Sequence, residues 1–225
     1  MGSYKDVGDW LPFMTGNDRE REVEMAQRIF KKLRGKGRNE GLLGVPFYLA
    51  FMHTGKEPKI LEINSRPGDP ESMNLIPVVA DDFVNVCYAM LDGSLKHVSM
   101  KPKATVVTYK VPASYGGYDR RFPEKVVKSE VGRCIDLTEA YRLVEKTKGA
   151  LRVYPGSIEQ RLDGVYALKS RAVACVGIGD SIEEARETSR SGIQSVRGGG
   201  LWNRGDVAAK EHIKKSIGHM KGLRA

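Results

Sequence analysis

The sequence has few of the residues that build disulfide frameworks or metal clusters. Its 225 residues include three cysteines and four histidines. No Cys-x-x-Cys pair occurs, and no histidine lies at metal-ligand spacing from another. Separated cysteines in odd number argue against a disulfide framework and a cysteine-ligated zinc site. We expect Cys87, Cys134 and Cys175 to be reduced and mostly buried.

The sequence also lacks a long apolar run. No stretch reaches the roughly 18 apolar residues that a membrane-spanning helix needs, and no basic segment followed by an apolar stretch begins the chain. We therefore predict a cytoplasmic protein without a membrane partner. With 40% hydrophobic and 29% charged residues, the chain can bury a core in one large domain or two small ones.

Acidic residues are outnumbered, and the formal net charge is +9. Such a charge can indicate nucleic acid or an anionic small molecule as a partner. The basic residues are spread along the chain, and the densest group, KKLRGKGR at 31–38, follows an amphipathic segment. Cations at a helix C-terminus interact favourably with its dipole. A solvated helix end explains this group, and we expect no nucleic-acid partner.

Hydrophobic spacing predicts helices and a hairpin in the first part of the chain. Residues 1–16 show no periodicity and read as an extended loop. Apolar residues at helical spacing then predict a helix from an N-cap at Asn17 to Gly35. The apolar segment 42–52, a turn and the segment 59–63 predict a β-hairpin, and a further helix is expected over 80–93.

The remainder of the chain is richer in short strands. Strands are expected at 104–111, 150–155, 157–162 and 170–179, a helix with a Ser181–Glu184 capping box through Val196, and a last helix over 206–220. We predict an α/β (α+β) fold with two domains, residues 1–98 and 99–225. The glycine-rich segment 197–206 follows a helix, so we interpret it as a structural turn rather than a phosphate loop.

The segment KILEINSRPGDPESMN, residues 59–74, carries the clearest candidate site. Strand side chains alternate between faces, so we expect Leu61 and Ile63 to enter the core while Glu62 and Asn64 share the other face, about 7 Å apart. A carboxylate beside an amide oxygen suits Mg²⁺, which takes few protein ligands and fills its shell with water and phosphates.

Arg66 lies just beyond this strand and offers a planar cation to a phosphoryl or carboxylate oxygen. The spacing Glu-x-Asn-x-Arg alone is weak, because a solvated polar strand face would show it too. The chain continues with Pro-Gly-Asp-Pro-Glu, a rigid and glycine-containing turn that opens a short helix. This combination favours a nucleotide-metal site.

Several segments together resemble the phosphoribosylamine–glycine ligase family of ATP-grasp enzymes. LEINSRPGDPESMNLIPVV resembles that family's Leu-Glu-Phe-Asn-x-Arg-Phe-Gly-Asp-Pro-Glu segment. The start MGSYKD, the strand GLLGVPFYLAFM and the segment SRAVACVGIGDSIEEARE also resemble family segments, in the same order. The resemblance implies the C-terminal part of an ATP-grasp domain with an antiparallel sheet, followed by a smaller strand-rich domain.

The resemblance also implies a reaction. ATP phosphorylates glycine to glycyl phosphate, and the amine of 5-phosphoribosylamine displaces phosphate to form glycinamide ribonucleotide in purine biosynthesis. By carry-over Glu62 and Asn64 bind Mg²⁺ or Mn²⁺, and Arg66 is catalytic by stabilising charge. Gly68, Asp69 and Glu71 are substrate-binding candidates, although an acid at a helix start also serves as a cap.

The sequence departs from the family pattern in three places. Pro67 stands where the family has Phe, and Ser65 where Cys or Ala is commoner. Pro67 biases Arg66 toward an extended backbone. The family carries a substrate domain and the other half of the ATP-grasp fold before the segment that Met1–Tyr4 resembles, so we expect an N-terminal polypeptide as a partner, and self-association in its absence.

Two classes of function remain open on the sequence. The chain is either a portion of an ATP-dependent ligase or a non-catalytic binding or assembly module that keeps the fold without turnover. The presence of Glu62, Asn64 and Arg66 together favours the ligase.

Overall fold

The computed structural model describes residues 1–8, 10–33, 42 and 44–225. They form two compact units, each assembled from two segments. Met1–Val7 and Lys103–Lys210 form the sheet unit, while Gly8–Pro102 and Glu211–Ala225 form the hairpin unit. The units differ from the expected ranges 1–98 and 99–225 mainly in where the first strand and the last helix lie. The division into sequence domains stays a prediction.

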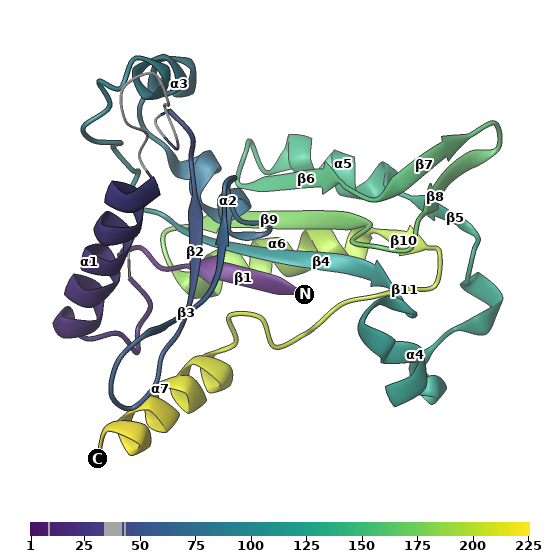
Figure 1. Cartoon of the computed structure of the whole chain (residues 1–225). Coiled ribbons are helices and arrows are strands. Elements are labelled where there is room, and N and C mark those ends of the chain that lie inside the picture. The colour runs from purple at the N-terminus through teal and green to yellow at the C-terminus, as the bar shows by residue number, and fades with distance from the viewer. Residues whose placement is uncertain (9, 34–41, 43) are drawn as a thin grey trace. The chain divides into compact units, whose positions relative to one another are not determined.

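The sheet unit is built on a five-stranded antiparallel sheet (Figure 1). Its strand order is β1 (Gly2–Lys5), β4 (Ala104–Pro112), β9 (Val173–Gly179) and β6 (Leu151–Pro155), with β11 (Leu201–Trp202) also paired to β4. The expectation that residues 1–16 are a loop is therefore wrong for β1. Its partner lies about a hundred residues away, and four residues with one glycine show no readable alternation.

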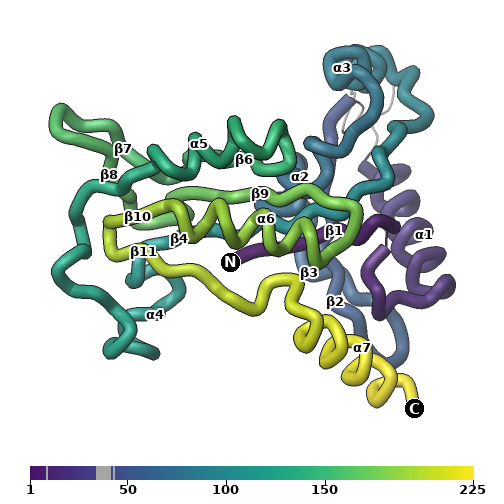
Figure 2. Tube along the Cα trace, turned by 180° about the vertical axis from the view of Figure 1, so that it is seen from behind, coloured from purple at the N-terminus to yellow at the C-terminus, as the bar shows by residue number. Residues whose placement is uncertain are grey.

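Helices α5 (Thr138–Lys146) and α6 (Ile182–Ser195) pack on this sheet. Figure 2 shows α6 running along β4 and β9. Ser181 accepts a hydrogen bond from the backbone N–H of Glu184 at 3.2 Å, so the predicted cap at Ser181 is confirmed. The Glu184 carboxylate accepts from the backbone N–H of Asp180 at 2.7 Å, one residue before the cap. Leu151, Cys175, Ile193 and other buried apolar side chains form the core beneath these helices.

A second, four-stranded sheet completes the sheet unit. Its order is β10 (Arg197–Gly198), β5 (Cys134–Asp136), β8 (Gly164–Ala167) and β7 (Ile158–Arg161). Gly198, Gly199 and Gly200 all have positive φ angles, between 61° and 75°. A Cβ at Gly198 would lie 2.3 Å from the Cys134 carbonyl oxygen. The glycine-rich segment is therefore a structural turn, as predicted.

Short helical turns follow strand β4 and bring aromatic rings together. They are η2 (Tyr115–Gly117), α4 (Tyr118–Arg121), η3 (Pro123–Lys125) and η4 (Lys128–Glu130). The ring of Tyr118 stacks on that of Trp202 with centroids 3.7 Å apart. The Trp202 indole N–H donates to the Pro112 carbonyl at 3.2 Å, which fixes this corner of the sheet unit.

The hairpin unit contains four α-helices, one short 3₁₀ turn and a two-stranded antiparallel sheet within its described residues. The elements are α1 (Gly16–Leu33), β2 (Tyr48–Met52), β3 (Lys59–Asn64), α2 (Glu71–Leu75), η1 (Ile76–Val78), α3 (Phe83–Leu91) and most of α7 (Lys210–Arg224). Helix α1 lies beside the hairpin in Figures 1 and 2. Ile60 of β3 shares a surface hollow with Met25 and Ile29 of α1.

The start of α1 corrects one expectation. Asn17 is not its N-cap, because the helix already begins at Gly16. Thr15 accepts from the Asp18 N–H at 3.2 Å, and Asp18 in turn accepts from the Thr15 N–H at 2.7 Å. Threonine and aspartate three residues apart thus form the reciprocal cap. The predicted helix end at Gly35 lies outside the described residues.

The hairpin itself is confirmed, but the expected burial of its apolar residues is wrong. Leu61 is 60% exposed and Ile63 is 47% exposed. The register pairs Leu49 with Ile63 and Ala50 with Glu62, then shifts at Phe51. Alternation specifies which side chains share a face, whereas burial also needs a layer against that face. The described residues supply no such layer over Leu61 and Ile63.

Cysteine burial also differs from expectation. Of the three free thiols, Cys175 is buried, Cys87 is half-buried and Cys134 is exposed. Burial raises the pKa of the Cys175 thiol to about 12, despite the nearby Lys110 charge. Within the described ranges, none of the helices is both long enough and apolar enough to cross a membrane.

Candidate functional site

Strand β3 presents its two candidate metal ligands on one face. Tyr48 pairs with Asn64 and Ala50 with Glu62 across the hairpin, and directly paired residues of antiparallel strands share a face. The Asn64 side-chain amide Nδ2 donates to Glu62 Oε1 at 3.0 Å. The carboxylate and the amide therefore lie side by side, and Tyr48 lies next to them.

The loop after β3 returns toward this face through Gly68. Gly68 is buried, and a Cβ built on it would lie 3.0 Å from two ring carbons of Tyr48 and 2.7 Å from Glu71 Oε2. The Ser72 N–H donates to the Gly68 carbonyl at 2.9 Å, which joins the loop to α2. Only glycine fits this close approach without displacing Tyr48 or Glu71.

Glu71 is the first residue of α2. Pro70 is at the N-cap position, and no side chain there accepts a hydrogen bond from the first turn. Instead, the Tyr48 hydroxyl donates to the Glu71 carboxylate. Burial raises the pKa of Tyr48, and the negative charges of Glu71 and Glu62 raise it further. The charges of both carboxylates therefore act on one phenol.

The other two candidates lie elsewhere on the loop. Arg66 is exposed, and its Nη1 donates to the Pro67 carbonyl at 2.9 Å. Asp69 is exposed between the buried Gly68 and Pro70. The structure thus brings Glu62, Asn64 and, through Tyr48, Gly68 and Glu71 together.

Sequence reasoning missed Tyr48. A tyrosine in an apolar strand normally indicates packing. Only the cross-strand register, which pairs it with Asn64, could have revealed its place beside the candidate ligands.

Comparison with known proteins shows what the chain is similar to. No protein-family model matches the chain. Curated phosphoribosylamine–glycine ligases do: the one from Methanocaldococcus jannaschii is 37% identical and the one from Thermococcus kodakarensis 36% identical, each match covering 100% of this chain and 47% of the relative. The chain matches the C-terminal part of phosphoribosylamine–glycine ligases. It spans about half the length of the curated relatives it matches.

A solved structure shows the same fold. The phosphoribosylamine–glycine ligase from Thermotoga maritima superimposes with a TM-score of 0.68 over 92% of this chain and 46% of that chain, at 21% sequence identity. The predicted fold, a mixed α/β arrangement with antiparallel sheets, is confirmed. At this level of identity the likeness shows the fold alone.

The ligase-like strand offers oxygen ligands for a divalent cation. Across the described parts of the chain, no three His, Cys, Asp or Glu side chains cluster closely enough to hold a metal ion. Glu62 and Asn64 supply two oxygen donors on one face. Mg²⁺ typically binds through one or two protein carboxylates and keeps water and substrate phosphates as its other ligands. The donor set fits such a cation.

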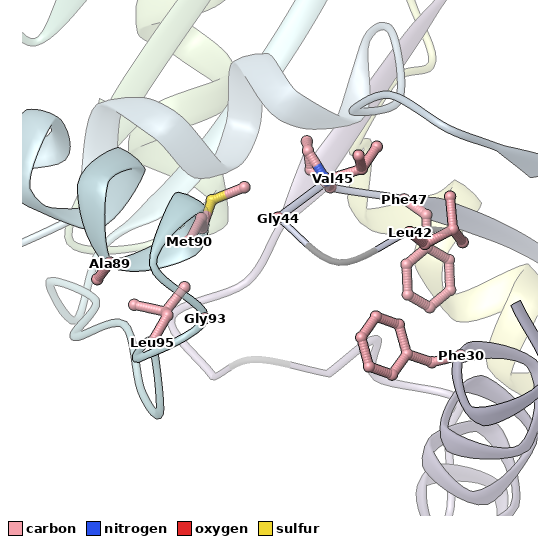
Figure 3. Close-up of a pocket in the computed structure, with 10 residues that line it drawn as sticks. Phe30, Leu42, Gly44, Val45, Phe47, Ala89, Met90, Gly93 and Leu95 are labelled. Atoms are coloured by element: carbon pink, nitrogen blue, oxygen red, sulfur yellow. The ribbon is translucent and has the colours of Figure 1, made fainter. Parts of the chain in front are cut away.

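An apolar hollow of about 530 Å³ lies in another part of the hairpin unit (Figure 3). The rings of Phe30 and Phe47 stack at 6.0 Å on one side of it, and Met90 and Leu95 lie on the other. None of the candidate site residues lines this hollow. The lining residues that the structure describes carry no acidic or basic side chain.

Proposed function

We propose that the chain supplies the metal-binding strand of an ATP-dependent carbon–nitrogen ligase that joins glycine to 5-phosphoribosylamine. The substrates follow from the name shared by the relatives, which match the chain from end to end. The single structural observation that supports the proposal is the Glu62–Asn64 pair, held side by side by a 3.0 Å hydrogen bond.

The reaction has two steps. A glycine carboxylate oxygen attacks the γ-phosphorus of ATP, the bond to the bridging oxygen breaks, and ADP leaves. The amine of 5-phosphoribosylamine then attacks the acyl carbon of glycyl phosphate, loses a proton and releases inorganic phosphate. Positioning and electrostatic stabilisation account for catalysis in phosphoryl transfer.

The chain's own residues position these groups. Glu62 and Asn64 hold Mg²⁺ or Mn²⁺, which when bound neutralises charge on the ATP phosphates. Arg66 is exposed at the end of the strand and is free to turn toward a phosphoryl oxygen, because its present partner is only a neighbouring carbonyl. Gly68, Asp69 and Glu71 form the loop that meets the other substrates.

Further partners follow from the length of the relatives. An N-terminal polypeptide corresponding to their other half completes the ligase, and the exposed Leu61 and Ile63 favour self-association when that half is missing. The alternative, a non-catalytic module, would leave the Glu62–Asn64 pair without a role.

Metal binding by the chain tests the proposal. Glu62→Gln removes the one charge of the pair and keeps the shape of the side chain, so we expect Mn²⁺ affinity to fall by about tenfold or more. The free-ion signal in electron paramagnetic resonance measures bound Mn²⁺. Glu24→Gln, an exposed acid on α1, is the matched control and should bind as the unaltered chain does.

Two results contradict the metal assignment. One is equal Mn²⁺ affinity in Glu62→Gln and Glu24→Gln, which would make the strand face merely solvated. The other is absence of Mn²⁺ binding to the unaltered chain in the millimolar range.

A further inference from the structure

We propose that Tyr48 is a positioning residue: its hydroxyl holds the Glu71 carboxylate on the Glu62–Asn64 face, making Glu71 the third oxygen group of the divalent-cation site. The inference rests on the proposed function, since it takes Glu62 and Asn64 as the cation's ligands. It assigns a role to a tyrosine that the Glu-x-Asn-x-Arg pattern does not include.

The strand register places Tyr48 at this face. Tyr48 is directly opposite Asn64, and Asn64 donates to Glu62, so the phenol and both candidate ligands are on one side of the hairpin. Paired residues in an antiparallel sheet have Cβ atoms about 4.5–5.5 Å apart, within reach of an aromatic side chain. Strand β2 therefore contributes a side chain to a site otherwise built by β3 and its loop.

The loop is packed so that Tyr48 and Glu71 meet. Gly68 lies against the Tyr48 ring and against Glu71 Oε2, with no room for a Cβ between them. The Tyr48 hydroxyl donates to the Glu71 carboxylate from this position. The start of α2 is therefore held next to strand β2 by contacts among Tyr48, Gly68 and Glu71.

Glu71 is the first residue of α2. Pro70, the N-cap residue of α2, makes no side-chain hydrogen bond to the first turn. A phenol donates one hydrogen bond, whereas a carboxylate accepts several. Glu71 consequently keeps acceptor capacity for a cation after Tyr48 has fixed its orientation.

Repulsion between carboxylates explains why the orientation of Glu71 must be held. The negative charges of Glu71 and Glu62 both act on Tyr48, and two carboxylates that share a site repel each other. A divalent cation held by both carboxylates would remove the repulsion, and a hydrogen-bonded carboxylate needs less ordering on binding. Without the hydroxyl, Glu71 can turn away and the cation loses an oxygen group.

A double-mutant cycle on Mn²⁺ affinity tests the inference. Tyr48→Phe deletes the hydroxyl and leaves the ring against Gly68, while Glu71→Gln removes the charge. We expect each to weaken Mn²⁺ binding by about tenfold, the effect of one hydrogen bond to a charged group. The double variant should bind no more weakly than Glu71→Gln alone. Tyr88→Phe, an exposed tyrosine on α3, is the control and should bind normally.

The outcomes separate this inference from the proposed function. Normal Mn²⁺ binding by Tyr48→Phe together with a loss in Glu62→Gln overturns the role of Tyr48 and leaves the metal site standing. Additive losses in the double variant overturn the coupling between Tyr48 and Glu71. Undiminished binding by Glu62→Gln contradicts the proposed site itself, and the inference with it.

A second readout does not depend on the folding of a variant. The ζ-carbon resonance of Tyr48 in the unaltered chain, assigned by its absence from Tyr48→Phe or by sequential assignment, should move on addition of Mg²⁺ and saturate at the metal's affinity. A tyrosine with only a packing role would keep its resonance. An unmoved Tyr48 resonance at saturating Mg²⁺ overturns the inference.

Discussion

At the scale of single residues, a half-buried polar network connects three segments of the hairpin unit. Glu22 of α1 lies 2.9 Å from His53 Nε2, and Arg224 of α7 pairs with Asp18 at 2.5 Å. Arg224 also donates to the Phe13 carbonyl at 3.0 Å. Burial and the Asp18 charge raise the pKa of Glu22 to about 7.

The pKa values of His53 and Asp18 in this network are both lowered. Burial lowers the pKa of His53, with Asp18 opposing and Arg224 reinforcing the shift. Burial alone would raise the pKa of Asp18, but hydrogen bonds from Thr15 and the charges of Arg224 and His53 lower it. At neutral pH a protonated Glu22 can therefore donate to a neutral His53.

This arrangement predicts a pH-dependent stability difference for Glu22→Gln. A folded-state pKa raised from 4.5 to about 7 gives stability that is complete below pH 4.5 and is lost as the pH rises through 7. Glutamine does not titrate, so only the unaltered chain loses this stability as the pH rises. The free energy of unfolding of the variant, relative to that of the unaltered chain, should therefore increase by about 1 kcal/mol from pH 5 to pH 8, after discounting for partial exposure. Urea unfolding at both pH values measures this. A difference independent of pH, or one equal to that of Glu24→Gln, would refute it.

At the scale of elements, a close helix–sheet contact passes through glycine. Gly177 of β9 faces α6, and a Cβ there would lie 2.0 Å from the Ala185 carbonyl oxygen and 2.5 Å from the Ser189 N–H nitrogen. Ser189 in turn donates to the Cys175 carbonyl at 2.9 Å. The helix can thus lie directly on the strand.

Gly177→Ala should therefore destabilise the sheet unit by about 3 kcal/mol, because neither backbone can yield without moving α6. Gly218→Ala, at a helical position of α7 with open space around it, is the matched control and should stabilise by about 0.5–1 kcal/mol. Thermal unfolding of both variants distinguishes them. Equal melting temperatures would mean that α6 is not closely packed on β9.

Elements with local signals were predictable from sequence. The hairpin, helix α6 with its Ser181 cap and strands β4 and β9 follow from periodicity and turn residues. Strand β1 was not predictable, since its pairing partner is β4. Helix α5 was missed among short strands, although Ala140, Leu143 and Val144 have helical spacing.

The candidate site was predictable only in part, for a similar reason. Alternation placed Glu62 and Asn64 together, but it could not show that Leu61 and Ile63 would be exposed. The contact between Tyr48 and Glu71 joins residues that are 23 positions apart in the sequence. It depends on the hairpin register and on the close approach at Gly68. Such non-local contacts leave no periodic pattern in a sequence.

At the scale of the whole molecule, the chain carries one strand face of the proposed site and matches about half of each relative. We expect the proposed ligase to bind ATP with residues from both halves. The 225-residue chain alone should therefore bind MgATP no more tightly than about millimolar, or about 4 kcal/mol of binding free energy.

The most direct test is glycine-dependent ADP release, with 5-phosphoribosylamine present, by a fusion of the first half of the Methanocaldococcus jannaschii ligase to this chain. We predict turnover by the fusion, none by the chain alone, a loss of several powers of ten in Glu62→Gln, and an unchanged rate in Glu24→Gln. Undiminished turnover in Glu62→Gln, or an inactive fusion beside an active parent ligase, would contradict the assignment of this strand as the metal-binding strand of a phosphoribosylamine–glycine ligase.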